Sequence, residues 1–97
     1  MASAPVNLYG PTMEQAAAWR VSINAHGPDG FDGEVVAMLL FCSDVGGTIV
    51  RYTVGHSSLC VEIEVVGWTE QAARTRALSK TAAVLGKEWT LQITDGC

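Results

Sequence analysis

The residues best suited to bind a small polar ligand lie in a glycine-rich loop at positions 27–33. The loop places two carboxylates among three glycines, directly before an apolar run. Backbone N–H groups that open a helix attract a carboxylate, and an aspartate beside them could receive an amino group. The loop therefore predicts a site for a small molecule that carries both groups, with candidate residues Gly27, Asp29, Gly30, Asp32 and Gly33.

The same loop also has a purely structural interpretation. Asp32 is placed to cap a helix, Asp29 is placed to form an Asx-turn, and the glycines turn the chain. Two carboxylates would also repel a ligand that carries a free carboxylate. The sequence leaves both interpretations open.

Other reactive side chains do not form a recognisable catalytic or metal-binding set. His26 and His56 are the only histidines. His56 with Cys60 offers two ligands separated by a turn, fewer than a zinc site needs. No serine lies in the strained turn that exposes a nucleophile. We expect no catalytic residue, no metal and no cofactor, and therefore no enzyme.

The charge balance disfavours nucleic acid as a partner. The chain has 10 acidic and 6 basic residues, a formal net charge of −4 and a pI near 4.9, which is a poor basis for holding a polyanion. Arg76, Lys80 and Lys87 lie near one another on a predicted helix. They could meet an acidic or phosphate-bearing partner, or form a solvated helix face.

The three cysteines favour a reducing compartment. Cys42, Cys60 and Cys97 are odd in number and lack CxxC spacing, and the first residues lack the basic start and apolar stretch of a signal peptide. We expect a cytoplasmic protein in which Cys42 and Cys60 are buried or half-buried thiols.

Size and hydropathy indicate one domain. The chain has 97 residues, 48% of them hydrophobic, and a mean hydropathy of +0.23. The longest apolar run covers residues 35–42, whereas a membrane helix needs about 20 residues, so we expect no membrane association through a spanning helix. Residues 1–18, with two prolines, are expected to form an arm that is partly disordered, with a short helix over 13–18. Residues 19–97 form the predicted domain.

Periodicity within that domain predicts four strands and two helices. Apolar residues alternate along 19–26, along a hairpin whose arms are 50–54 and 59–65, and along 89–94. Helical patterns cover 34–43, capped by Asp32, and 70–85, capped by Thr69. The hairpin register pairs Val54 with Leu59, and its other predicted pairs are Tyr52 with Val61, Val50 with Ile63 and Arg51 with Glu62.

The order strand, helix, strand, strand, helix, strand predicts an α+β, ferredoxin-like split βαβ fold. Both helices should cover one face of a four-stranded antiparallel sheet with strand order 4-1-3-2. The predicted core on that face is Trp19, Val21, Ile23, Val50, Tyr52, Val54, Leu59, Val61, Ile63, Trp89, Leu91 and Ile93, with Ala73, Ala77, Thr81 and Val84 from the second helix.

The uncovered face of this sheet is predicted to be polar. It carries no aromatic residue on its central strands, so it does not suit RNA recognition by stacking. It also lacks the apolar residues that dimeric α/β-barrel enzymes place around a pocket. Its predicted members are Arg20, Ser22, Asn24, His26, Ile49, Arg51, Thr53, Cys60, Glu62, Glu64, Thr90, Gln92 and Thr94.

The first helix is apolar on nearly all sides. Val35, Met38, Leu39 and Cys42 form a stripe at helical spacing, and further apolar residues flank it. A helix of this kind must be buried on more than one side, which in so small a domain predicts a homodimer or higher homo-oligomer.

The stretch from Gly27-Pro28-Asp29 through Ile49 resembles an ACT domain, the regulatory module of amino-acid metabolism. The element order agrees along 19–94. In two respects the chain departs from the family pattern, because Asp32 stands where the family has a proline before the loop glycine, and the Phe31-Asp32 loop is longer. The resemblance implies a dimer that holds an amino acid or similar small molecule at the loop, against the partner subunit.

Two functions follow as expectations. The first is a small regulatory or ligand-binding module that resembles an ACT domain. The alternative is a non-catalytic assembly protein that oligomerises, or docks on a larger partner, through its apolar first helix.

Overall fold

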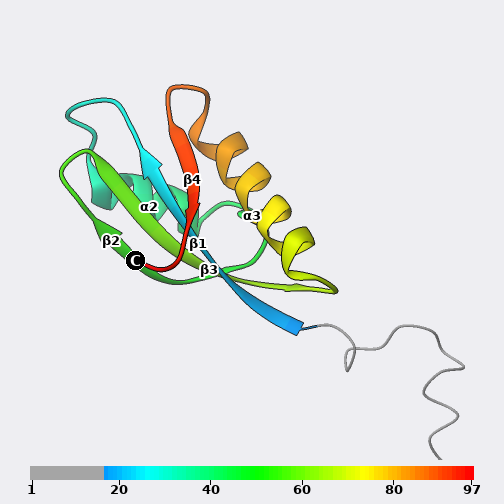
Figure 1. The fold of residues 1–97 in the computed structure, drawn as a ribbon. Coiled ribbons are helices and arrows are strands. Elements are labelled where there is room, and N and C mark those ends of the chain that lie inside the picture. The colour runs from blue at the N-terminus through cyan, green and yellow to red at the C-terminus, as the bar shows by residue number, and fades with distance from the viewer. Residues whose placement is uncertain (1–16) are drawn as a thin grey trace, which may run out of the picture.

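Six secondary-structure elements make up the computed structural model, which describes residues 17–97 (Figure 1). They confirm the predicted element order. In chain order they are β1 (Ala17–His26), α2 (Gly33–Phe41), β2 (Thr48–Val54), β3 (Ser58–Gly67), α3 (Glu70–Leu85) and β4 (Thr90–Thr94).

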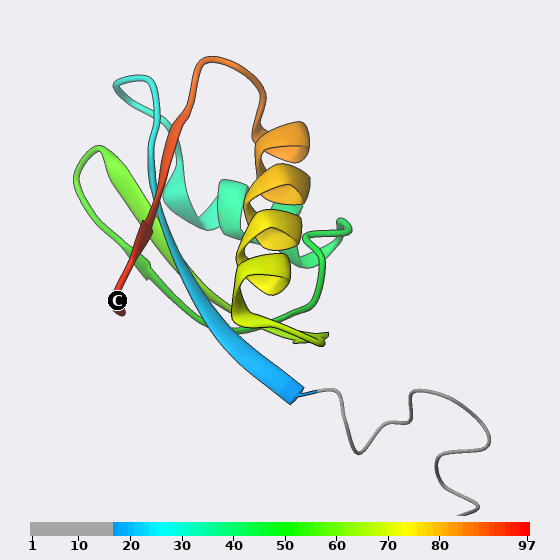
Figure 2. The same cartoon turned by 45° about the vertical axis from the view of Figure 1, so that its right-hand side comes forward.

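The four strands form one antiparallel sheet in the order β2-β3-β1-β4. Read from the other edge, this is the predicted order. Both helices lie on the same side of the sheet, as the turned view in Figure 2 shows, and the other side is open. The α+β class and the antiparallel sheet are therefore confirmed, and the arrangement fits a ferredoxin-like class.

The core lies between the two central strands and the helices. The period-two alternation is confirmed in β1 and β3, where alternate residues over 21–25 and 59–65 point to the helices and are 2% exposed or less. Small residues of α3, Ala73 and Ala77, let that helix approach the sheet closely, and Thr81 is fully buried beside them. The buried strand residues are Val21, Ile23, Ala25, Leu59, Val61, Ile63 and Val65.

Strand β2 contains an irregularity that the predicted register missed. Tyr52 pairs with Val61 and Val54 with Leu59, as expected, but Ile49 and not Val50 lies opposite Ile63. Val50 is the extra residue of a bulge and is 43% exposed. The prediction of Val50 in the core and Ile49 on the open face was wrong, because one inserted residue exchanges the faces of all residues before it.

The buried face of α2 also differs from the predicted one. Gly33, Ala37 and Leu40 face the sheet, and the stripe that includes Val35 and Met38 faces outward. Both sets have helical spacing, so periodicity could not choose between them. The close approach of the helix to the sheet favours the set with the smaller side chains.

Strand β1 begins earlier than the sequence indicated. Ala17 and Ala18 pair with Gly67 and Val66 of β3, so they belong to the sheet and not to an arm or a helix. The rest of the predicted arm, with most of the predicted helix over 13–18, lies outside the described residues.

Overpacking at Ala77 tests the close contact between α3 and the sheet. We expect Ala77→Leu to lower the free energy of unfolding by about 1–3 kcal/mol, because the added atoms find no space in a filled core. The control is Ala72→Leu on the exposed side of the same helix, for which a change within about 0.5 kcal/mol is expected. Urea denaturation measures both, and equal effects would contradict the close packing.

Candidate functional site

In the loop predicted as a ligand site, Asp32 caps the N-terminus of α2. Asp32 Oδ1 accepts hydrogen bonds from the backbone N–H groups of Glu34 at 3.1 Å and Val35 at 3.3 Å. The next N–H group, that of Val36, donates to the Asp32 carbonyl at 3.0 Å. The donors that would attract a ligand carboxylate are thus engaged by Asp32, as the structural interpretation predicts.

The loop glycines allow close contacts with neighbouring side chains. A side chain at Gly27 would overlap the ring of Trp89, and one at Gly33 would overlap Val54 of β2. Gly30 has a φ of 82°, the left-handed region that favours glycine. The loop therefore has structural reasons for each of its three glycines, while Asp29 is exposed.

Two further contacts hold the loop against its neighbours. Phe31 packs edge-on against Trp89, with ring centroids 4.7 Å apart, and the Gly27 N–H donates to the Ser57 carbonyl at 3.2 Å. The five candidate residues therefore lie together in one loop that spans the end of β1 and the start of α2.

The open face centres on Glu62, which lies between two arginines. The predicted partner Arg51 lies 3.4 Å from Glu62, measured from Nε to Oε1, and Arg20 of β1 lies 3.7 Å away on the other side. Glu62 is only 8% exposed, and its Oε1 makes no hydrogen bond of good geometry within residues 17–97. The second arginine was missed because it requires the register between β1 and β3, which the sequence pattern does not supply.

The cysteines differ from the prediction. Cys60 and Cys97 form a disulfide, and Cys42 is an exposed free thiol at the end of α2. Cys60 is half-buried in a strand as expected, but it is not a free thiol, and the expected burial of Cys42 was wrong. Cysteine spacing could not reveal the pair, because the two residues are 37 positions apart and meet only through the return of β4 beside β1.

The disulfide also bears on the compartment. Disulfides persist in oxidising environments, whereas the first residues predicted a cytoplasmic protein. The cytoplasmic location stays a prediction. Within residues 17–97, no helix combines the length and the apolar character that crossing a membrane requires.

An exposed apolar surface lies on the outward side of α2. We call it the α2 face and define it as Val35, Met38, Leu39 and Phe41. These side chains are 62%, 62%, 47% and 50% exposed. The only charged residue of α2, Glu34, accepts a hydrogen bond from the Tyr52 hydroxyl at 2.8 Å, which raises the pKa of Tyr52. The four residues of the α2 face are uncharged, and the carboxylate of the adjacent Glu34 is held by the Tyr52 hydroxyl.

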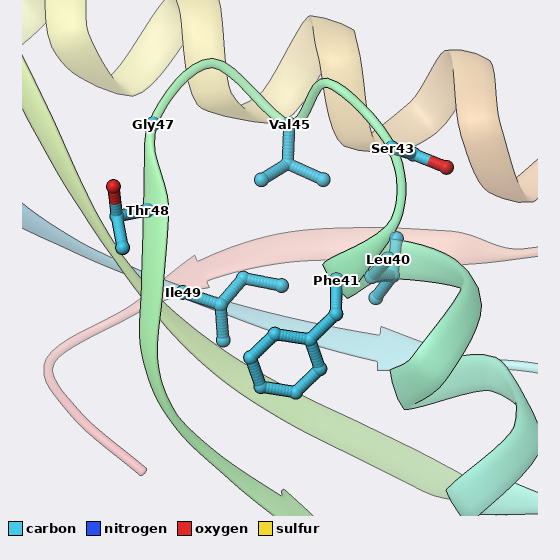
Figure 3. A pocket seen from close by; sticks show the side chains of 7 residues that line it. All are labelled: Leu40, Phe41, Ser43, Val45, Gly47, Thr48 and Ile49. Carbon is cyan, nitrogen blue, oxygen red and sulfur yellow. The ribbon is translucent and has the colours of Figure 1, made fainter.

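A cavity continues the α2 face at the C-terminal end of the helix. It has a volume of about 280 Å³ and lies between α2 and the start of β2. Figure 3 shows Val45, Ile49 and Phe41 converging on it. Phe41 also packs edge-on against Tyr52, with ring centroids 5.8 Å apart. The residues that line the cavity are Leu40, Phe41, Ser43, Val45, Gly47, Thr48 and Ile49.

Asp44 fixes the loop that borders this cavity. Its carboxylate accepts from the Gly46 N–H at 2.9 Å and from Lys80 Nζ of α3 at 3.1 Å. The Gly46 hydrogen bond, followed by the contact with Lys80, lowers the pKa of Asp44. Lys80 is therefore paired within the chain, which leaves the predicted basic stripe weaker as a site for an acidic partner.

No group of three or more potential metal ligands comes together in the part of the chain that the structure describes. His56 is exposed in the hairpin turn, and its suggested partner Cys60 is bonded to Cys97.

Comparison with known proteins gives no relative. No family model, no curated protein and no solved structure matches the chain. The resemblance to the ACT domain therefore stays a prediction.

The cap in the loop is tested by alanine substitution. We expect Asp32→Ala to lower the free energy of unfolding by about 0.5–2 kcal/mol, because two N–H groups of α2 lose their acceptor. Asp29→Ala, in the same loop but exposed, is the control and should change it by less than about 0.5 kcal/mol. Thermal and urea unfolding measure both, and a neutral Asp32→Ala would show that the cap does not stabilise the loop.

Proposed function

We propose that this chain is a non-catalytic assembly module that pairs with a second copy of itself through the α2 face. The observation that carries the proposal is the exposure of four large apolar side chains on one side of a single helix. Apolar patches of this kind on small proteins mark sites of protein contact.

Charge favours a second copy as the occupant of this face. The chain has a formal net charge of −4, so two copies repel one another over most of their surfaces. None of the four residues of the α2 face is charged, and the carboxylate of the neighbouring Glu34 is hydrogen-bonded to the Tyr52 hydroxyl. A contact across a two-fold axis places the same patch on both sides, so here apolar side chains would meet apolar side chains.

The cavity beside the helix supports the same arrangement. Phe41 belongs both to the α2 face and to the cavity lining. A side chain such as Met38 from the second copy could therefore enter the space next to Phe41. Anchors that fill pockets at the centre of an interface contribute most of its binding energy.

A charge on the α2 face tests this contact. We expect the wild-type chain to sediment as a dimer at about 100 µM, a concentration well above the dissociation constant of a micromolar complex. Met38→Asp should be monomeric, because a carboxylate would be buried against its own copy. Met38 is 62% exposed, so the folded monomer should tolerate the change.

The matched control adds the same charge elsewhere. Ala72→Asp lies on the exposed side of α3, in its first turn, where a negative charge is favourable. This variant should remain dimeric in sedimentation-velocity measurements. A wild-type chain that stays monomeric at millimolar concentration would rule out the proposal, as would a Met38→Asp variant that dimerises like the wild type.

A second proposal retains the ferredoxin-like, ACT-like regulatory function. The observation that favours it is the position of the 27–33 loop, since Gly33 packs against Val54 of the edge strand β2 at the start of α2. A contact between copies through α2 would bring this loop toward the partner subunit. An amino acid or similar small molecule would then bind there, with Asp29 receiving its amino group.

Ligand binding is tested by a thermal-shift screen against the amino acids. We expect at least one amino acid at millimolar concentration to raise the unfolding temperature, because a ligand that binds only the folded state stabilises it. Asp29→Asn should abolish that shift, whereas Asp95→Asn, which follows the far end of β4, should preserve it. Absence of a shift with every amino acid would contradict this second proposal and leave the assembly module untouched.

A further inference from the structure

The last three residues, 95–97, cross the open face of the sheet. Strand β4 ends at Thr94, which pairs with Ser22 of β1. Cys97 is bonded to Cys60 of β3, and β1 lies between β4 and β3. Figure 1 shows the red end of the chain turning away from β4 toward β2 and β3. We call residues 95–97 the C-terminal tail.

The disulfide is the main contact that holds this tail. All three residues of the tail are exposed. Among residues 17–97, the tail takes part in one hydrogen bond, from the Thr94 hydroxyl to the Gly96 carbonyl. It is 3.5 Å long, at the weak end of the range. The position of the tail therefore depends on a covalent bond that a small thiol can reach from solvent.

Because the tail crosses the open face instead of continuing β4, part of β1 has no paired strand on the β4 side within residues 17–97. All ten residues of β1 pair with β3, whereas β4 pairs only with Ser22–His26. On the β4 side, residues 17–21 of β1 have no partner strand within residues 17–97. Unpaired N–H and C=O groups on a strand edge are ready to accept another strand.

The tail is in register with this free edge. If the pairing of Thr94 with Ser22 continued by three residues, Asp95 would lie opposite Val21, Gly96 opposite Arg20 and Cys97 opposite Trp19. Neither β1 nor the tail contains a proline in these positions. The chain thus has the length and the register to extend β4, and the bond to Cys60 prevents it.

We propose that the Cys60–Cys97 disulfide is a redox-sensitive switch that sets the path of the C-terminal tail. In the oxidised chain the tail is fastened across the open face. In the reduced chain the tail extends β4 along residues 19–21 of β1, which closes the free edge and uncovers the open face around Ser22. This proposal does not depend on the contact between copies.

The chemical step is thiol–disulfide exchange with a small thiol such as glutathione. The thiolate attacks Sγ of Cys97, a mixed disulfide forms, and Cys60 leaves as a thiolate that takes up a proton. A second glutathione attacks the mixed disulfide and releases Cys97 as a thiol together with oxidised glutathione. Two electrons pass from two glutathione molecules to the protein, and the reverse sequence restores the bond.

The switch is tested by NMR on the isotope-labelled 97-residue chain. A Cys42→Ser background removes the free thiol and excludes bonds between chains. We expect reduction to produce interstrand nuclear Overhauser contacts between Asp95–Cys97 and Trp19–Val21 that the oxidised chain lacks. At least one backbone N–H of the tail should also exchange with solvent at least tenfold more slowly.

A matched variant separates the switch from a general loss of stability. Cys97→Ser keeps the length of the chain but cannot form the bond, so it should show the same contacts with or without reductant. Dispersed amide signals from β1 and β3 would confirm that it is folded. A tail that exchanges at the rate of a free chain end in both the reduced protein and Cys97→Ser would overturn the proposal. So would protection of residues 17–21 by another segment in the oxidised chain.

Discussion

The pairing of β1 with β3 is the constraint on which the rest of the structure depends. It runs over all ten residues of β1 and fixes both faces of the sheet at once, because alternate residues point to opposite sides. On the helix side it aligns Val21 and Ile23 with Ile63 and Val61 in the centre of the core.

The same pairing organises the open face. It places Ser22 opposite Glu62, so that Glu62 lies between arginines of the two neighbouring strands, β1 and β2. Both arginines are more than half exposed, so solvent screens these contacts and each stabilises the fold only modestly. The two arginines, one on each side, nevertheless explain why the carboxylate of Glu62 lies at the centre of the sheet face that no helix covers.

The two helices contribute unequally to covering this sheet. α3 has 16 residues and contacts both central strands and β4, whereas α2 has 9 and lies over β2 and β3. Only Gly33, Ala37 and Leu40 of α2 are buried. α2 has more apolar side chains than the sheet can cover from one side. The side chains that stay exposed form the α2 face.

Much of the fold could be predicted from the sequence because local signals agree with the tertiary arrangement. The caps at Asp32 and Thr69 and the alternation in β1 and β3 correctly indicated the element order. The bulge at Val50 and the buried side of α2 could not be predicted, since both depend on how neighbouring elements approach one another. The disulfide likewise follows from the path of the chain after β4 and not from cysteine spacing.

The role of the candidate loop could likewise not be predicted from the sequence. Its glycines and aspartates have the types that a ligand site needs, yet Asp32 is engaged as a cap and Gly27 and Gly33 allow close packing. Residue types alone could not separate these roles, because a helix start attracts a capping carboxylate and a ligand carboxylate by the same N–H groups. The excess of apolar residues in α2, in contrast, follows directly from the apolar run in the sequence, although the run does not tell which of them face outward.

The central claim, that two copies meet through the α2 face, is tested most directly by isotope-filtered NMR on a mixture of labelled and unlabelled chains. The account predicts intermolecular contacts among the methyl groups of Val35, Met38 and Leu39 and the ring of Phe41. Intermolecular contacts confined to another surface, such as the sheet edges or α3, or a complete lack of them at millimolar concentration, would contradict it.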